Sequence, residues 1–129
     1  YVGAVTSGKL TFLSGAGPRQ ADGSFVQGKV GSAISIEQAQ AAAKLTGIVL
    51  LEALKAEIGD LKKVKRIVKV LGMVNAIPSF TQQPQVMNGF SDFMVEVFGE
   101  KGKHARSAVG VGSLPSDIPV EIEMIVEVY

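Results

Sequence analysis

The chain has 129 residues, 47% of them hydrophobic and 19% charged, and a formal net charge of +1. These values suit one compact domain covering residues 1–129 and exclude a disordered chain, and a charge so close to zero provides no long-range attraction for nucleic acid or an anionic membrane. The chain has no cysteine and one histidine, which excludes disulfides, thiolate nucleophiles, zinc–thiolate sites and a multi-histidine metal site within one chain.

The sequence carries no targeting or membrane signal. No apolar run approaches the ~20 residues of a membrane-spanning helix, and no signal peptide is visible. The chain begins with Tyr1 rather than methionine, so we expect further residues to precede it. A cytoplasmic location is the default expectation.

Residues 1–15 predict a β-hairpin. The segment Val2–Thr6 reads as the first strand, Ser7-Gly8 as the turn and Leu10–Leu13 as the second strand, which Ser14-Gly15 closes. The region that follows, from Ala16 to Ser35, lacks periodicity and is rich in turn residues, with one short strand expected near residues 24–30. Loops of this length in compact domains are often functional.

Two helices are predicted in the middle of the chain. Ser35 and Gln38 form a capping box that starts an alanine-rich helix ending at Ile58, with Gly59 beyond it. The core-facing residues of this helix are expected to be Ala39, Ala43, Leu50, Leu54 and Ile58. A second helix is predicted from about Pro84 to Phe98, ended by Gly99. Its buried stripe is expected to contain Val86, Met87, Phe90, Met94 and Val97.

Three further strands complete the pattern. Lys62–Asn75 is rich in β-branched residues and reads as an interior strand. Two extended runs, Arg106–Val111 and Val120–Tyr129, lie on either side of a segment rich in proline and glycine. In the last run an apolar residue occupies every second position from Val120 to Val128, and the positions between them are mostly glutamates, which is typical of a strand with one buried face. Helices placed between strands of one mixed sheet predict an α+β fold with both helices on one face.

Arg106 is the first candidate functional residue. It lies at the head of its predicted strand and shares one face with Ala108 and Gly110. Small neighbours allow a ligand to approach the backbone while a guanidinium group binds a carboxylate. This pattern indicates an anion site.

A second group of candidates consists of carboxylates on the last strand. Glu121, Glu123 and Glu127 share one strand face, and residues two positions apart on a strand are separated by roughly 6.5–7 Å, so two of them could act in one site. The residue pattern does not choose among them, and a solvent-facing role is the preferred interpretation for Glu127. No metal site or cofactor is expected.

Other polar features favour structural interpretations. The basic residues between Lys62 and Lys69 lack aromatic partners for stacking nucleotides, so they are interpreted as a solvated strand end. His104 lies on the face of Arg106, and we interpret it as an exposed histidine with no catalytic role. Neither a phosphate-binding glycine loop nor a nucleophile elbow is present.

Several of these segments together resemble the YjgF/RidA family, known as reactive-intermediate (enamine/imine) deaminases and, in older naming, as L-PSP endoribonucleases. The resemblance covers nearly the whole chain and is carried by Tyr1-Val2, Leu13-Ser14-Gly15, Asn88, Ala105-Arg106-Ser107, and Leu114-Pro115 followed by Val120-Glu121-Ile122-Glu123. It implies a chorismate-mutase-like fold and a homotrimer with three clefts between subunits.

The resemblance also implies roles for individual residues. Arg106 is expected to pair with the substrate carboxylate, and Glu121 to orient or protonate the attacking water. Tyr1 is expected to line the cleft from the neighbouring subunit, with Ser14 and Gly15 beside the ligand and Asn88 supporting the wall. Ala108 stands where many deaminases of the family have cysteine, so this position is expected to contribute backbone groups. The segment 16–38 is several residues longer than in typical members, which is expected to reshape the mouth of the cleft.

The implied reaction is hydrolysis of a 2-enamine or 2-imine carboxylic acid to a 2-keto acid and ammonia, without metal or cofactor. Two other functions remain open. One is a non-enzymatic trimer that binds small carboxylates or stabilises a partner, and the other, with less support, is an endoribonuclease. Retention of both Arg106 and Glu121 favours catalysis over a purely structural role.

Overall fold

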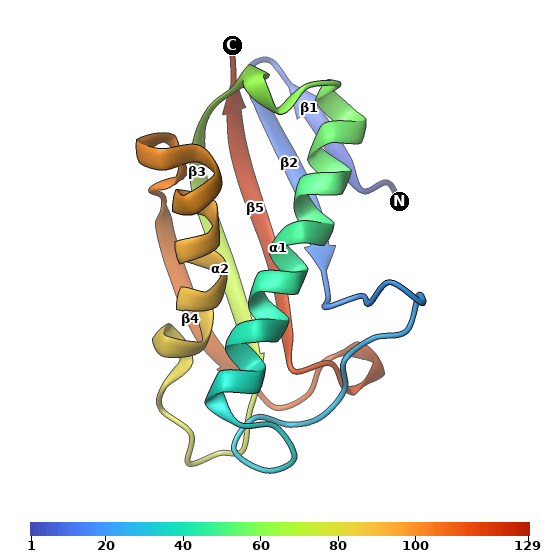
Figure 1. Cartoon of the computed structure of the whole chain (residues 1–129), viewed down its shortest axis with the longest axis vertical. Helices are drawn as coiled ribbons and strands as arrows, with labels where there is room; N and C mark the ends of the chain where they lie inside the picture. Colours follow the sequence, from blue (N-terminus) through green and yellow to red (C-terminus); the bar gives the residue numbers. More distant parts are fainter.

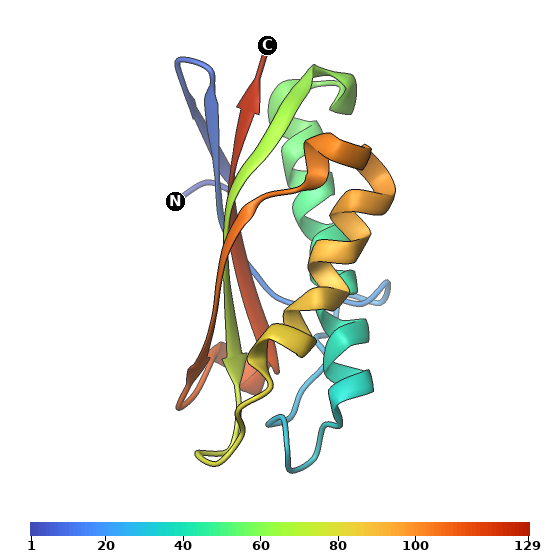
Figure 2. The same cartoon turned by 90° about the vertical axis from the view of Figure 1, so that its left-hand side faces the viewer.

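The computed structural model describes all residues 1–129 and consists of two layers, a mixed sheet and two helices that cover one of its faces (Figure 1, Figure 2). The strand order is β1-β2-β5-β3-β4, and all neighbours are antiparallel except β3 and β4. The strands are β1 (Ala4–Ser7), β2 (Leu10–Ala16), β3 (Val64–Asn75), β4 (Ala105–Val111) and β5 (Val120–Val128). This arrangement confirms the predicted α+β, chorismate-mutase-like fold.

Strand β5 lies in the middle of the sheet and shows the predicted alternation. Its buried residues face the helices and are Val120, Ile122, Met124, Val126 and Val128. The glutamates between them lie on the opposite face, which no helix covers (Figure 2). Burial of one face thus sets the register of the sheet, because a slip of one residue would bring these glutamates into the core.

Helix α1 (Ile36–Ile58) begins and ends where the sequence predicts. The Ser35 side chain accepts from the Gln38 backbone N–H, and the Gln38 side chain accepts from the Ser35 backbone, which completes the capping box. Gly59 follows the helix with a φ of 88°, a conformation that favours glycine. Four of the five expected core residues are buried, and Ile58 packs at the margin of the core.

Helix α2 (Gln83–Phe98) crosses α1 at very close range. A Cβ atom on Gly89 would overlap the backbone of Gln40, so only glycine allows this approach. Val86, Met87, Phe90 and Met94 are buried as predicted. Val97, however, is 42% exposed, because it lies in the last turn, beyond the main contact with the sheet.

The N-terminal region departs from the prediction in two details. The hairpin turn is Gly8-Lys9 rather than Ser7-Gly8, since Ser7 still pairs with Leu10. No strand forms near residues 24–30, where only isolated bridges join Arg19 to Phe25 and Val30 to two later residues. The segment lacks a neighbouring strand long enough to extend these bridges into a ladder.

A partly buried hydrogen-bond network ties this long segment to the loop before β5. Lys29 Nζ donates to Asn75 Oδ1 at 2.6 Å and to the Gly112 carbonyl at 2.7 Å. Asn75, 1% exposed, donates through Nδ2 to Asp117 Oδ1 and to the Ile118 carbonyl, each at 3.1 Å. The network holds both loops at the ends of the central strands.

Neither helix of the structure is both long and apolar enough to cross a membrane.

Gly89→Ala tests the close helix crossing. Alanine favours a helix over glycine by about 1 kcal/mol, but its Cβ must displace the Gln40 backbone, which no rotamer change relieves. We expect a net loss of roughly 1–3 kcal/mol in the free energy of unfolding, as for other overpacked sites, measured by urea denaturation. Gly112→Ala, where a Cβ meets nothing within 4 Å, is the control. Equal stability of the two variants would contradict the close approach.

Candidate functional site

The guanidinium group of Arg106 lies between β4 and α2. Arg106 pairs with the buried Val70 and therefore points to the helix side of the sheet. Its Nη1 donates to Asn88 Oδ1 at 2.9 Å and to Ser91 Oγ at 3.1 Å. Asn88 and Ser91 are three positions apart on α2 and so project from the same side of the helix.

These contacts leave one edge of the guanidinium group available. Nη1 carries two hydrogens, and the two acceptors on α2 use both of them. No hydrogen bond with the protein involves Nε or Nη2 of Arg106. This free edge has the fork geometry that binds a carboxylate through two parallel hydrogen bonds.

Arg106 also lines a cavity of about 350 Å³ on the outer side of α2 and β4. The other lining residues are Ser91, Asp92, Val95, Lys103 and His104, so the cavity is mainly polar. Its charged side chains are Arg106, Asp92 and Lys103, and Lys103 is paired with Glu100 at 2.7 Å, so Arg106 is the cation that remains to bind an anion. The cavity is therefore suited to a small anion.

His104 differs from its sequence interpretation. It lies on the face of Arg106 as expected, but it is half-buried rather than exposed, with its ring edge-on to Phe90 at a centroid distance of 6.0 Å. Its Nδ1 lies 2.6 Å from the Gly102 carbonyl, and its Nε2 lies 2.9 Å from Ser91 Oγ. Burial lowers the pKa of His104 below its usual range, and the charge of Arg106 acts in the same direction against the opposing effect of the Gly102 carbonyl.

The remaining predicted site residues form a second group on the open face of the sheet. Glu121 lies directly beside Gly15, where a Cβ atom on the glycine would come within 2.5 Å of Glu121 Oε2. Ser14 donates through Oγ to the Val2 carbonyl at 2.6 Å, which attaches the N-terminal segment to β2. Tyr1, at the start of that segment, is fully exposed.

The sheet separates the two groups within one chain. Arg106, Asn88 and Ala108 lie on the helix side at β4, whereas Ser14, Gly15 and Glu121 lie on the open side at β2 and β5. The family motifs predict a single site that contains all of these residues, but within one chain they lie on opposite sides of the sheet. Ser91 was missed, although its spacing from Asn88 on the predicted helix was a usable signal.

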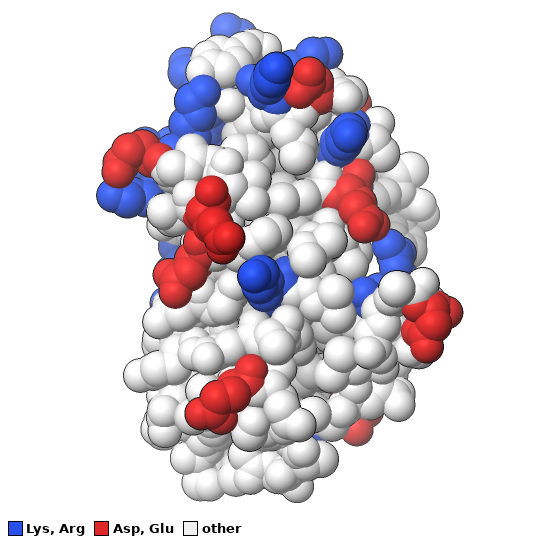
Figure 3. All heavy atoms as spheres, viewed as in Figure 1, with Lys and Arg blue, Asp and Glu red and all other residues white.

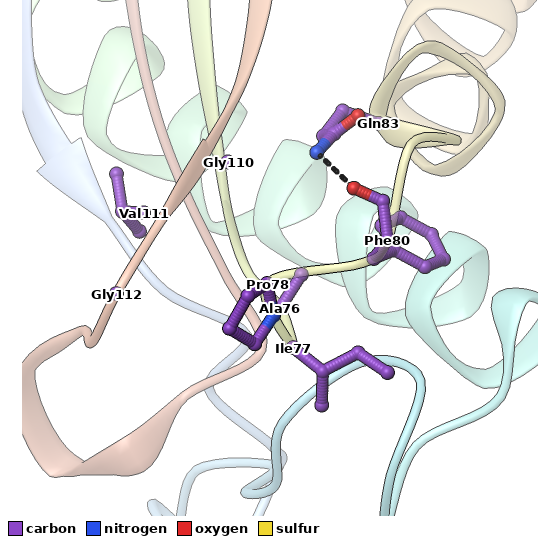
Figure 4. A pocket seen from close by; sticks show the side chains of 8 residues that line it. All are labelled: Ala76, Ile77, Pro78, Phe80, Gln83, Gly110, Val111 and Gly112. Atoms are coloured by element: carbon purple, nitrogen blue, oxygen red, sulfur yellow. Dashed lines mark hydrogen bonds between the residues drawn. The ribbon is translucent and has the colours of Figure 1, made fainter.

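A separate cavity of about 360 Å³ lies at the other end of β4 (Figure 4). It is formed by the segment after β3, the first turn of α2 and the end of β4. Gln83 donates through Nε2 to the Phe80 carbonyl at 3.0 Å and covers Gly110. The cavity has no charged side chain and contains none of the predicted site residues.

Charged residues elsewhere do not form a concentrated site. Lys62, Lys63, Lys65 and Arg66 are exposed, as expected for a solvated strand end, whereas Lys69, which was expected to belong to the same solvated end, is half-buried and donates to Ser107 Oγ at 3.2 Å. On the helix face, acidic and basic side chains are intermixed over the upper part and the lower part is largely uncharged (Figure 3). No three His, Asp or Glu side chains converge as a metal ion would require.

Comparisons with known proteins identify the family. Residues 2–126 match the family model described as "YjgF/chorismate mutase-like, putative endoribonuclease". Protein TCP17 from Trypanosoma cruzi is 42% identical over 128 residues, which are 98% of this chain and 80% of that protein.

Solved structures agree with this result. The crystal structure of Atu1372 from Agrobacterium tumefaciens, a protein of unknown function, is 42% identical with a TM-score of 0.97, over 99% of this chain and 82% of its own. A "putative endoribonuclease" from Shewanella oneidensis is 26% identical with a TM-score of 0.95, over 99% and 85% of the two chains. The fold, the matched residues and these relatives together establish that the chain belongs to the YjgF/RidA family.

Proposed function

We propose that this protein hydrolyses reactive 2-enamine and 2-imine carboxylic acids to 2-keto acids and ammonia in the cytoplasm. The enamine first tautomerises to the imine, water adds to the imine carbon, and the carbon–nitrogen bond then breaks to release ammonia. One water is consumed, and the carbonyl oxygen of the product comes from it.

The free edge of Arg106 is the observation that carries this proposal. A guanidinium group held through Nη1 on two helix acceptors is already oriented, so less rotamer freedom is lost when a carboxylate binds. The substrates have a carboxylate next to the imine carbon. Binding that carboxylate therefore places the reacting carbon at a defined distance from the arginine.

The chemistry makes modest demands on the remaining residues. An imine carbon is already electrophilic, so the site must mainly hold the substrate, position a water and supply a proton. In our proposal Glu121 orients or protonates the water. Tyr1, Ser14, Gly15 and the backbone of Ala108 line the ligand, and Asn88 supports Arg106.

The separation of the two residue groups supports a site shared between subunits. Arg106 and Glu121 face opposite sides of one sheet, so a cleft that contains both needs a second chain. The open face has exposed apolar side chains at Val5, Phe12 and Val109, which a neighbouring copy could cover. We therefore propose a homotrimer with the sites in the clefts between subunits.

Two alternatives have less support. A protein that only carries keto acids would need Arg106 but not Glu121. A ribonuclease, which the description of the family suggests, would need a surface for RNA. The exposed lysines near residue 62 have one exposed aromatic beside them, Tyr129, whose ring is already in contact with Lys101 Nζ at 5.1 Å from its centroid, and Lys65 lies 4.0 Å from Glu127.

Arg106→Ala tests the carboxylate role. A dehydratase acting on serine or threonine would generate the imine, and release of keto acid would be followed with and without the protein. We expect the wild type to accelerate release and kcat/KM to fall by at least about 100-fold in the variant, because two hydrogen bonds between charged groups are lost and each contributes roughly 1.5–3 kcal/mol. Arg106→Lys should recover only part of the activity, since an ammonium group lacks the fork geometry.

Arg19→Ala is the matched control, because it removes the same charge from an exposed pair with Glu52. It should behave like the wild type. A folded, oligomeric wild type that does not accelerate keto-acid release would overturn the deaminase proposal for these substrates. Binding of 2-oxobutanoate without turnover would then favour the carrier.

Mixed oligomers test whether the site is shared. Arg106→Ala and Glu121→Gln would each have strongly reduced activity alone, while co-refolding them produces clefts in which one subunit supplies an intact Arg106 and its neighbour an intact Glu121. We expect activity to reappear in the mixture, with oligomeric state followed by analytical ultracentrifugation. A mixed oligomer as inactive as its parents would contradict a shared cleft.

A further inference from the structure

Arg106 is connected to His104 through a row of hydrogen bonds that includes Ser91. Arg106 Nη1 lies 3.1 Å from Ser91 Oγ, Ser91 Oγ lies 2.9 Å from His104 Nε2, and His104 Nδ1 lies 2.6 Å from the Gly102 carbonyl. The row starts at the guanidinium group and ends on a backbone group that cannot move independently. No motif of the family pointed to Ser91 or His104.

The direction of each hydrogen bond in the row follows from the groups involved. A carbonyl oxygen only accepts, so His104 Nδ1 must donate to Gly102. In a neutral ring Nε2 then accepts, and the Ser91 hydroxyl must donate to it. The lone pairs of Ser91 Oγ are left to accept from Arg106 Nη1, which always carries hydrogen.

Packing keeps the imidazole ring in this orientation. His104 is half-buried and edge-on to Phe90, whose side chain is fully buried. The ionisable groups around the ring are Arg106 on β4, Asp92 on α2 and Lys103 in the preceding turn, and all line the same cavity. Lys103 is paired with Glu100 at 2.7 Å, so the positive charge that acts on the ring is that of Arg106.

We propose that Ser91 and His104 are positioning residues for Arg106. The neutral imidazole orients the Ser91 hydroxyl, and the oriented hydroxyl holds Nη1 so that the Nε and Nη2 edge stays open for the ligand carboxylate. The inference deepens the proposed function, because it rests on Arg106 as the carboxylate-binding residue. Neither Ser91 nor His104 touches the reacting carbon in this arrangement.

The first experiment determines the protonation state of His104 in the protein without any ligand. His104 is the only histidine in the chain, so its two ring nitrogens can be assigned directly by ¹H–¹⁵N NMR. We expect a neutral ring protonated on Nδ1 at pH 7.5, with a pKa below the usual value near 6.5. A ring protonated on Nε2, or charged at this pH, would overturn the proposal.

NMR also reports how fast the guanidinium group of Arg106 rotates. The chain has three arginines, and Arg106→Lys identifies the relevant signal. We expect rotation of the Arg106 guanidinium to be slow in the wild type and fast in Ser91→Ala and His104→Phe. Unchanged rotation in both variants would show that the row does not hold Arg106, whatever the protein does catalytically.

Binding of 2-oxobutanoate then measures the effect on the site. Ser91→Ala and His104→Phe should each weaken binding about 10-fold, the loss expected for one hydrogen bond to a charged group. Ser91→Thr keeps the hydroxyl and His104→Gln keeps an acceptor, so both should retain most of the affinity. The double variant Ser91→Ala/His104→Phe should bind no more weakly than the weaker single variant, because both changes break one row.

Controls separate positioning from folding and from the proposed function. Ser32→Ala, on an exposed loop, should bind like the wild type, and thermal unfolding should show that every variant is folded. Additive losses, or equal losses in the conservative and disruptive variants, would overturn the proposal. If the wild type bound no keto acid, the proposed function would fail, while the NMR experiments would still decide whether Ser91 and His104 hold Arg106.

Discussion

Burial of only one face of the sheet is the constraint on which the rest of this structure depends. Both helices lie on that face, so the buried apolar side chains of every strand point toward them, while apolar residues such as Phe12 and Val109 stay exposed on the other face. On β5 this requirement directs Ile122 and Met124 into the core and Glu121 to the open face. On β4 the paired register directs Arg106 beneath α2. The hydrophobic core therefore also determines which side of the sheet each candidate functional residue occupies.

The packing of α2 against β4 determines how the Arg106 side chain is oriented. Strand β4 is at the edge of the sheet and has small residues after Arg106, so a long side chain can lie between strand and helix and remain partly exposed. Asn88 and Ser91 hold one side of its guanidinium group, and the other side stays free. Because the helix position depends on the close crossing at Gly89, packing between the helices also affects the candidate site.

The candidate site could be predicted only in part. Arg106 and its small neighbours form a local pattern, and the family motifs pointed to Glu121, so the sequence names both as candidates, and their roles stay predictions. The contacts of His104 were not found, because they join residues 13 positions apart across two elements whose relative register the sequence does not state. The exposure expected for His104 was wrong for the same reason: Phe90 and Ser91 come to it from a helix.

By itself the sequence determined the kinds of elements, most of their boundaries and the family. These features depend on short-range physics: a capping box at Ser35, a glycine after each helix, and strict alternation along β5. Tertiary structure alone decided the path of residues 16–35, the row from Arg106 to Gly102, and the placement of Arg106 and Glu121 on opposite faces. Those features depend on which distant segments pack together. Burial of the whole core determines that packing, and no local sequence pattern does.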